Sequence, residues 1–65
     1  MFRVEIIFAG ARADHRIASP KYGSMEEAQA EFRALNKQRL EAPLVERNWA
    51  RLASDAVLAV CVVEE

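Results

Sequence analysis

The 65-residue sequence has few of the residues that cross-link very small domains. Its single cysteine, Cys61, excludes a disulfide within the chain, and its single histidine, His15, excludes a zinc cluster of the Cys/His type. A chain of this size buries only about 60% of the surface that its unfolded form exposes, so its stability is marginal. By elimination, association with a second subunit is the remaining source of stabilisation.

Glycine, charge imbalance and long apolar runs are scarce as well. The two glycines, Gly10 and Gly23, are too far apart to form a phosphate-binding loop, and no acidic or histidine cluster has metal-ligand spacing. The net charge of −1 gives no general reason to expect nucleic acid or an anionic membrane as partner. The longest apolar run is far shorter than the roughly 20 residues that span a bilayer. We therefore expect no cofactor, no metal and no membrane, and the unpaired cysteine favours a cytoplasmic location.

The first part of the chain alternates apolar with other residues. Every second residue from Phe2 to Phe8 is bulky and apolar, which predicts a half-buried strand. A weaker alternation over residues 13–19 predicts a second strand, joined to the first by a turn at residues 10–12. This second strand is polar and has few bulky side chains, so we expect it at an edge of the sheet.

A capped helix follows the hairpin. Ser24 and Glu27 have the spacing of a capping box, in which the serine hydroxyl accepts a hydrogen bond from the backbone N–H three residues later. The helix is expected to run from about Met25 to about Leu40. One apolar stripe along it would face the sheet, made of Met25, Ala28, Phe32 and Leu35.

Pro43 interrupts this helix, because proline inside a helix removes a hydrogen bond and clashes with the preceding turn. Proline is favourable at the first position of a new helix, so a second helix over residues 44–53 is predicted. Its apolar side chains would recur with helical spacing, at Val45, Trp49, Leu52 and Ala53. A single kinked helix is the alternative.

The chain then ends in the run AVLAVCVVEE, which reads as a third strand. The predicted fold is a single α+β domain of order β-β-α-(α)-β, with a small, mostly antiparallel three-stranded sheet and one or two helices on one face. All residues from Val57 to Val63 are apolar, although a strand with one solvated face normally alternates. One alternate set of this strand, either residues 57, 59, 61 and 63 or residues 58, 60 and 62, would face the helices. The other set would be exposed to solvent on the opposite face of the sheet.

This open apolar set predicts a homodimer. Exposed aliphatic side chains in a row mark an interface, and each is worth about 1.5–3 kcal/mol when it is fully buried. The expected interface residues are Leu58, Val60 and Val62, and pairing can be edge to edge or face to face. The alternative is that the second helix or a terminus covers this face within one chain.

Three single residues are weighed as candidate sites. His15 lies between Asp14 and Arg16, but no nucleophile or second acid is identified beside it, so we interpret it as a surface histidine. Cys61 lies among valines and is interpreted as a structural thiol. Trp49 is interpreted as a core residue, with an interface anchor as the alternative. No catalytic residue is predicted.

The hairpin carries a local excess of positive charge, which supports the runner-up function. The possible contacts to a partner or to nucleic acid are Arg12, His15, Arg16 and Lys21. Two-stranded ribbons enter the DNA major groove in some proteins, but Asp14 interrupts this patch. The leading hypothesis is a non-enzymatic protein that binds another macromolecule, most simply another protein, and is itself a homodimer. Nucleic-acid binding is the alternative, and an enzyme with a cleft at the dimer interface ranks third.

Overall fold

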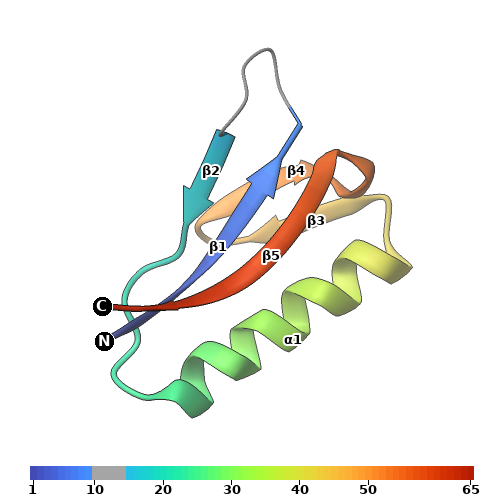
Figure 1. Cartoon of the computed structure of the whole chain (residues 1–65). Coiled ribbons are helices and arrows are strands. Elements are labelled where there is room, and N and C mark those ends of the chain that lie inside the picture. Colours follow the sequence, from blue (N-terminus) through green and yellow to red (C-terminus); the bar gives the residue numbers. More distant parts are fainter. Residues whose placement is uncertain (10–14) are drawn as a thin grey trace.

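A computed structural model of the chain describes residues 1–9 and 15–65 (Figure 1). Three antiparallel strands form one sheet, and its elements are β1 (Phe2–Phe8), β2 (His15–Ala18) and β5 (Val57–Glu64). The other elements are the helix α1 (Met25–Glu41), the strands β3 (Leu44–Arg47) and β4 (Ala50–Ala53) and the short 3-10 helix η1 (Ser54–Ala56). The α+β class predicted from the sequence is confirmed.

Strand β1 lies at the centre of the sheet, in the order β2-β1-β5. The first predicted strand is therefore confirmed, and so is the edge position of the second, which ends at Ala18, one residue before the expected boundary. Ile6 of β1 lies opposite Ile17 of β2 and opposite Val60 of β5. The turn predicted at residues 10–12 lies outside the described residues. Figure 1 shows the two ends of the chain side by side, and Glu65 N–H donates to the Met1 carbonyl.

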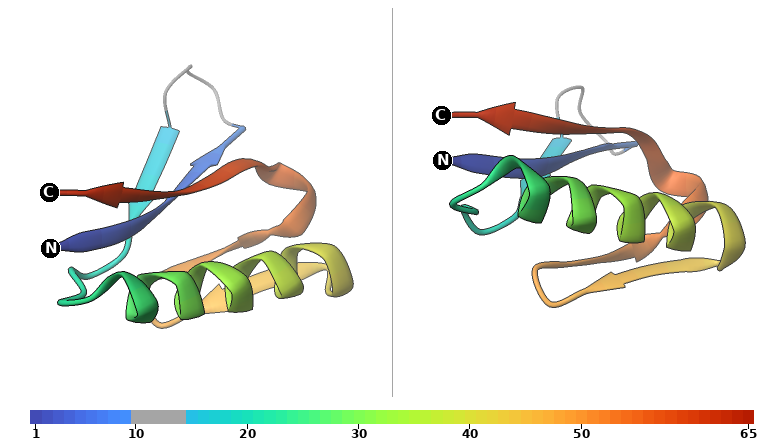
Figure 2. Two further views of the ribbon diagram at one scale, coloured as in Figure 1. Left: turned by 60° about the horizontal axis from the view of Figure 1, so that its bottom comes forward. Right: turned by 90° about the horizontal axis from the view of Figure 1, so that it is seen from below.

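The helix and the β3–β4 hairpin lie side by side on the same face of this sheet (Figure 2). We call this the inner face and the opposite one the outer face. The four largest fully buried side chains come from three elements: Val4 and Ile6 of β1, Leu35 of α1 and Val45 of β3. The single core thus needs both α1 and the hairpin to cover the inner face.

Helix α1 begins as the capping box predicts. Ser24 is the N-cap, and its hydroxyl oxygen accepts a hydrogen bond from the backbone N–H of Glu27 at 3.2 Å. Ala28 and Leu35 are buried, and Phe32 packs against the core, so the predicted apolar stripe faces the sheet. The helix ends at Glu41, one residue beyond the expected boundary.

The second helix predicted after Pro43 is wrong, and so is the kinked-helix alternative. Residues 44–53 form an antiparallel hairpin, with Val45 opposite Leu52 and Arg47 opposite Ala50. A two-residue connection, Asn48–Trp49, joins the strands, and asparagine is favourable in turns. Two residues seven positions apart are neighbours on a helix, but they are also neighbours across this hairpin. The spacing of Val45 and Leu52 therefore fits both structures.

Strand β5 contains an irregularity that decides which side chains face the core. Its register pairs Ile7 with Ala59 but Phe8 with Val57, so Leu58 has no partner of its own. An extra residue in one strand is a β-bulge, which bends the strand and interrupts the ladder. The alternation of inner and outer side chains is therefore reversed at Leu58.

The bulge corrects the expectation that alternate residues of the last strand form two uniform sets. Val57 is buried, and Val60 and Val62 pack against the same core, so all three belong to the inner face. The outer face receives the small or half-buried residues Ala59, Cys61 and Val63, opposite Ile7, Glu5 and Arg3 of β1. A continuous apolar run contains no signal for a bulge, because every residue in it suits either face.

Candidate interaction surface

The second edge of β5 is free, because β5 is the last strand of the sheet and no described strand pairs with its far side. Phe2 exchanges backbone hydrogen bonds with Tyr22, and the Val4 carbonyl accepts a hydrogen bond from the Ser19 N–H. The backbone groups of Phe2 and Val4 therefore point toward β2. In a central strand, the backbone groups of successive residues form hydrogen bonds alternately with the strand on one side and the strand on the other. Arg3 and Glu5 therefore turn toward β5.

The same alternation fixes the direction of the backbone groups on β5. Val63 and Cys61 are the partners of Arg3 and Glu5, so their N–H and C=O groups point to β1. The N–H and C=O groups of Val60 and Val62 consequently point away from the sheet, at the free edge. Such an unpaired row of donors and acceptors is a template for pairing with another strand.

The three residues expected at the dimer interface do not share one face. The side chains of Val60 and Val62 pack on the core, and only Leu58, at the bulge, is strongly exposed at 61%. What Val60 and Val62 present outward is their backbone. An interface at this strand stays a prediction, and the structure supplies a different chemical basis for it: hydrogen-bonding groups at an apolar edge, in place of an exposed aliphatic face.

An open groove of about 670 Å³ lies beside the first residue of β5. Its lining combines the end of α1 with the turn before β5 and consists of Arg39, Leu40, Pro43, Ala53, Ser54, Asp55 and Val57. Leu40 is 81% exposed, and among the described residues no carboxylate lies within salt-bridge distance of Arg39. The groove therefore offers an apolar wall together with a basic and an acidic side chain, Arg39 and Asp55, that do not form an ion pair with each other.

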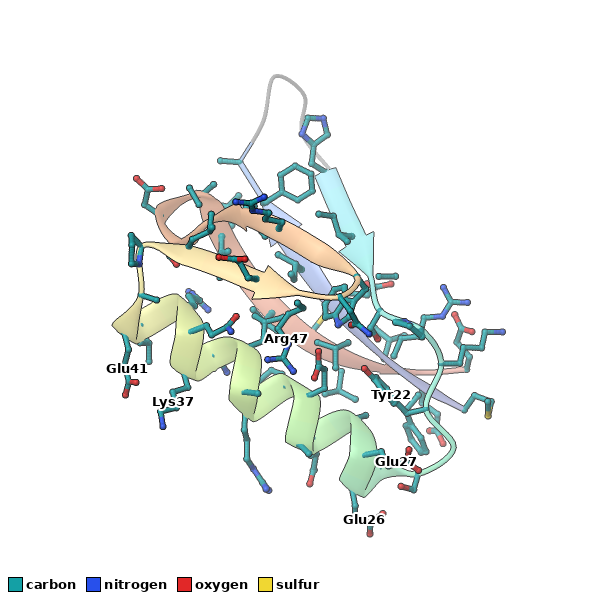
Figure 3. All side chains as sticks on the ribbon, turned by 180° about the vertical axis from the view of Figure 1, so that it is seen from behind. Tyr22, Glu26, Glu27, Lys37, Glu41 and Arg47 are labelled. Atoms are coloured by element: carbon teal, nitrogen blue, oxygen red, sulfur yellow. The ribbon has the colours of Figure 1, made fainter. Side chains whose placement is uncertain are left out.

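Sequence reasoning missed a second polar site, between α1 and the hairpin. Glu31 of α1 accepts two hydrogen bonds from the Arg47 guanidinium, one of them from Nε at 2.8 Å, and a third from Trp49 Nε1 at 2.6 Å. The Glu31 and Arg47 side chains are only 12% and 25% exposed. In Figure 3, Arg47 lies between β3 and α1, whereas Lys37 and Glu41 project away from the hairpin. This group anchors the hairpin to the helix.

The contacts between Glu31 and Arg47 shift the pKa values of both side chains. The hydrogen bond from Arg47 lowers the pKa of Glu31 against the opposing effect of burial, and the bond from Trp49 contributes in the same direction. The hydrogen bond to Glu31 raises the pKa of Arg47. Burial raises the pKa of Tyr22, and the nearby charge of Glu31 adds to this shift. The shifts of Glu31 and Arg47 describe two groups that stabilise each other's charged form, as expected of a structural ion pair.

The residues of the predicted basic hairpin are partly neutralised by carboxylates. Arg16 lies 3.4 Å from a Glu5 oxygen, and Lys21 lies 3.2 Å from a Glu65 oxygen. The His15 ring packs at a centroid distance of 5.1 Å against Phe8. Arg12, the fourth predicted contact, lies outside the described residues. Nucleic-acid binding by this hairpin stays a prediction without support from these contacts.

The two remaining candidates, Trp49 and Cys61, occupy different surroundings. Trp49 lies in the turn of the hairpin, packs against the core and donates to Glu31. This placement agrees with a core role, and the alternative role as an interface anchor stays a prediction. Cys61 is a half-buried free thiol on the outer face of β5.

Comparison with protein-family models, curated proteins and solved structures gives no match for this chain. Within residues 1–9 and 15–65, no helix combines the length and the apolar character needed to cross a membrane. The same residues contain no group of three or more histidine, cysteine or acidic side chains that could hold a metal ion.

Proposed function

We propose that this protein acts by binding another polypeptide rather than by catalysis, that it works as a homodimer, and that it resides in the cytoplasm. The observation that carries the proposal is the free edge of β5. Backbone groups of Val60 and Val62 point outward there, between apolar side chains, and Leu58 stands exposed beside them. A sheet edge of this kind pairs with an extended segment through main-chain hydrogen bonds, and a second copy of the chain can supply that segment.

Two features support this use of the edge. Protein edges that stay single normally carry charged residues or proline, and residues 57–63 contain neither. A 65-residue chain without a disulfide is also short of stabilising contacts, and a second subunit supplies them. The free thiol of Cys61 supports the proposed compartment, since unpaired cysteines are typical of reducing conditions.

Sedimentation velocity over a dilution series tests the assembly. We expect about twice the chain mass of 7.3 kDa at high concentration, with dissociation on dilution. The thermal midpoint is expected to rise with protein concentration, because association stabilises only the folded state. A folded chain of single mass at every accessible concentration contradicts the proposal.

A further inference from the structure

We propose that two copies of the chain pair through β5 about a two-fold axis at Cys61, so that residues 59–63 of one copy run antiparallel to residues 63–59 of the other. This inference rests on the homodimer proposed above and specifies its geometry. The two three-stranded sheets then form one continuous six-stranded sheet. The partner is a second copy because the segment is complementary to itself in this register.

The register follows from the positions on either side of the apolar segment. A two-fold axis at Val60 pairs Val62 with the partner's Leu58, where the bulge interrupts regular pairing. A two-fold axis at Val62 places the partner's Glu64 opposite Val60. Only the axis at Cys61 pairs five regular, apolar residues with five others. It also makes Val60 and the partner's Val62 a hydrogen-bonded pair, as their outward backbone groups require.

The groove beside β5 supports the same register by charge. In this arrangement the partner's Glu64 lies opposite Leu58, next to Val57, which lines the groove. The side chain of Glu64 follows the alternation of Val60 and Val62 and therefore lies on the inner face, where the groove opens. The Arg39 guanidinium forms no salt bridge with a described residue, although Asp55 lines the same groove. The structure thus assigns Arg39 as the counter-charge for the partner's Glu64, twice per dimer.

Cross-linking of the two Cys61 thiols tests the proposed position of the two-fold axis. Cys61 and the partner's Cys61 form a non-hydrogen-bonded pair, in which the Cα atoms are about 4.5 Å apart and the side chains approach closely. That separation is within the range that a disulfide bridges. Treatment with diamide joins the two sulfur atoms, and the diazene takes up the two protons and two electrons that the thiols lose. We expect a covalent dimer on a non-reducing gel, and none for Cys61→Ala.

Charge reversal tests the groove contact. Arg39→Glu and Glu64→Arg should each weaken the dimer, on the order of tenfold in dissociation constant, because like charges then meet at both ends of the interface. The double variant should recover most of the loss. Arg33→Glu is the matched control, since Arg33 is an exposed residue of the same helix and does not line the groove. Its dimer should dissociate as the wild type does.

Face-to-face packing of two outer faces is the rival geometry, and two variants separate it from edge pairing. Ile7→Lys places a charge in the middle of the outer face, so it should leave the edge dimer intact and abolish a face-to-face one. Val62→Pro removes an outward N–H that the edge dimer needs, while the bonds between β1 and β5 do not use it. This variant should remain folded by circular dichroism and should sediment as a monomer.

The possible outcomes distinguish this register from the proposed function. A dimer that forms no Cys61 cross-link and shows no rescue by the charge swap overturns the register and leaves the homodimer standing. A dimer that survives Val62→Pro but is lost in Ile7→Lys assigns the interface to the outer face instead. A wild type that remains monomeric overturns both proposals.

Discussion

Val60 lies directly opposite Ile6 across the β1–β5 ladder, but the two side chains differ in exposure. Ile6 is 0% exposed at the centre of the sheet, whereas Val60, on the same face, is only half-buried. The apolar layer therefore thins toward the edge of β5, where the main-chain groups also lack partners. One added strand at this edge completes both the hydrogen bonding and the burial.

Loss of the helix cap should destabilise the chain. The Ser24 hydroxyl accepts the Glu27 N–H, so Ser24→Ala leaves this donor without a protein partner. We expect a loss of about 0.5–2 kcal/mol in the free energy of unfolding, measured by urea denaturation. Ser24→Asp is the control, because aspartate also caps helices, and it should retain the midpoint. An unchanged midpoint and slope for Ser24→Ala would show that the cap does not contribute.

Acidification should weaken the link between α1 and the hairpin. Arg47 lowers the pKa of Glu31 in the folded state below its ordinary value of 4.5. Glu31 therefore contributes stability above that value, and the contribution is lost as pH falls through 4.5 and then through the lower folded pKa. Between neutral pH and about pH 3, the unfolding free energy of Glu31→Gln should fall less than that of the wild type. Equal slopes for the two proteins would contradict this role of Glu31.

Removing the partner of Glu31 should be costly at neutral pH. Arg47→Met preserves much of the side-chain length but leaves the largely buried Glu31 carboxylate with Trp49 as its one donor among the described side chains. We expect a loss of about 1–3 kcal/mol in unfolding free energy, from chemical denaturation. Arg33→Met is the control, since Arg33 is exposed on α1 and forms no salt bridge with a described residue, and it should change stability by about 0.5 kcal/mol or less.

A double-mutant cycle can distinguish the hairpin from a helix over residues 44–53. Glu46 and Arg51 lie directly opposite each other on the hairpin, whereas on a helix residues five apart are not neighbours. Their alanine variants should show a coupling energy of about 0.2–1 kcal/mol at low salt. The same cycle with Glu41 and Arg51 should be additive. No coupling between Glu46 and Arg51 would argue against the cross-strand pair.

Deletion of Leu58 should be tolerated, although it lies inside a strand. Without Leu58, Val57 still pairs with Phe8 and Ala59 with Ile7, so the ladder becomes regular and the inner face keeps its residues. We expect a cooperative thermal transition, with a cost within the usual range of about 0.5–3 kcal/mol. Deletion of Glu5 from β1 is the contrasting variant. It turns Val4 away from the core, with a loss of about 1.5–3 kcal/mol from this side chain alone, and should abolish cooperative unfolding.

Local chemistry made the first half of the fold predictable. The alternation from Phe2 to Phe8 specifies which side of a strand is apolar, and the Ser24–Glu27 spacing specifies where a helix begins. Each signal involves residues within one turn or one strand, so no distant contact is needed to interpret it. The edge position of β2 followed in the same way, from its own polar composition.

The candidate surfaces were only partly predictable. Residues 57–63 indicated that the last strand could carry an interface, but not which of their groups face outward. The Arg39 groove and the Glu31–Arg47 pair left no sequence signal of their own, because each joins elements that are distant in the sequence. Had Val45 and Arg47 been interpreted as alternate residues of a strand, Arg47 would have been expected on the inner face.

The sequence by itself determined the α+β class, the strand β1, the capped helix α1 and the lack of any internal disulfide. These depend on the types of neighbouring residues and on their spacing along the chain. Only the tertiary structure decided that residues 44–53 form a hairpin, because the spacing of Val45 and Leu52 suits a helix equally well. It also decided which residues of β5 lie on the inner face and which on the outer face. The bulge at Leu58 arises from the register with β1, and a uniformly apolar run has no preference of its own for either face.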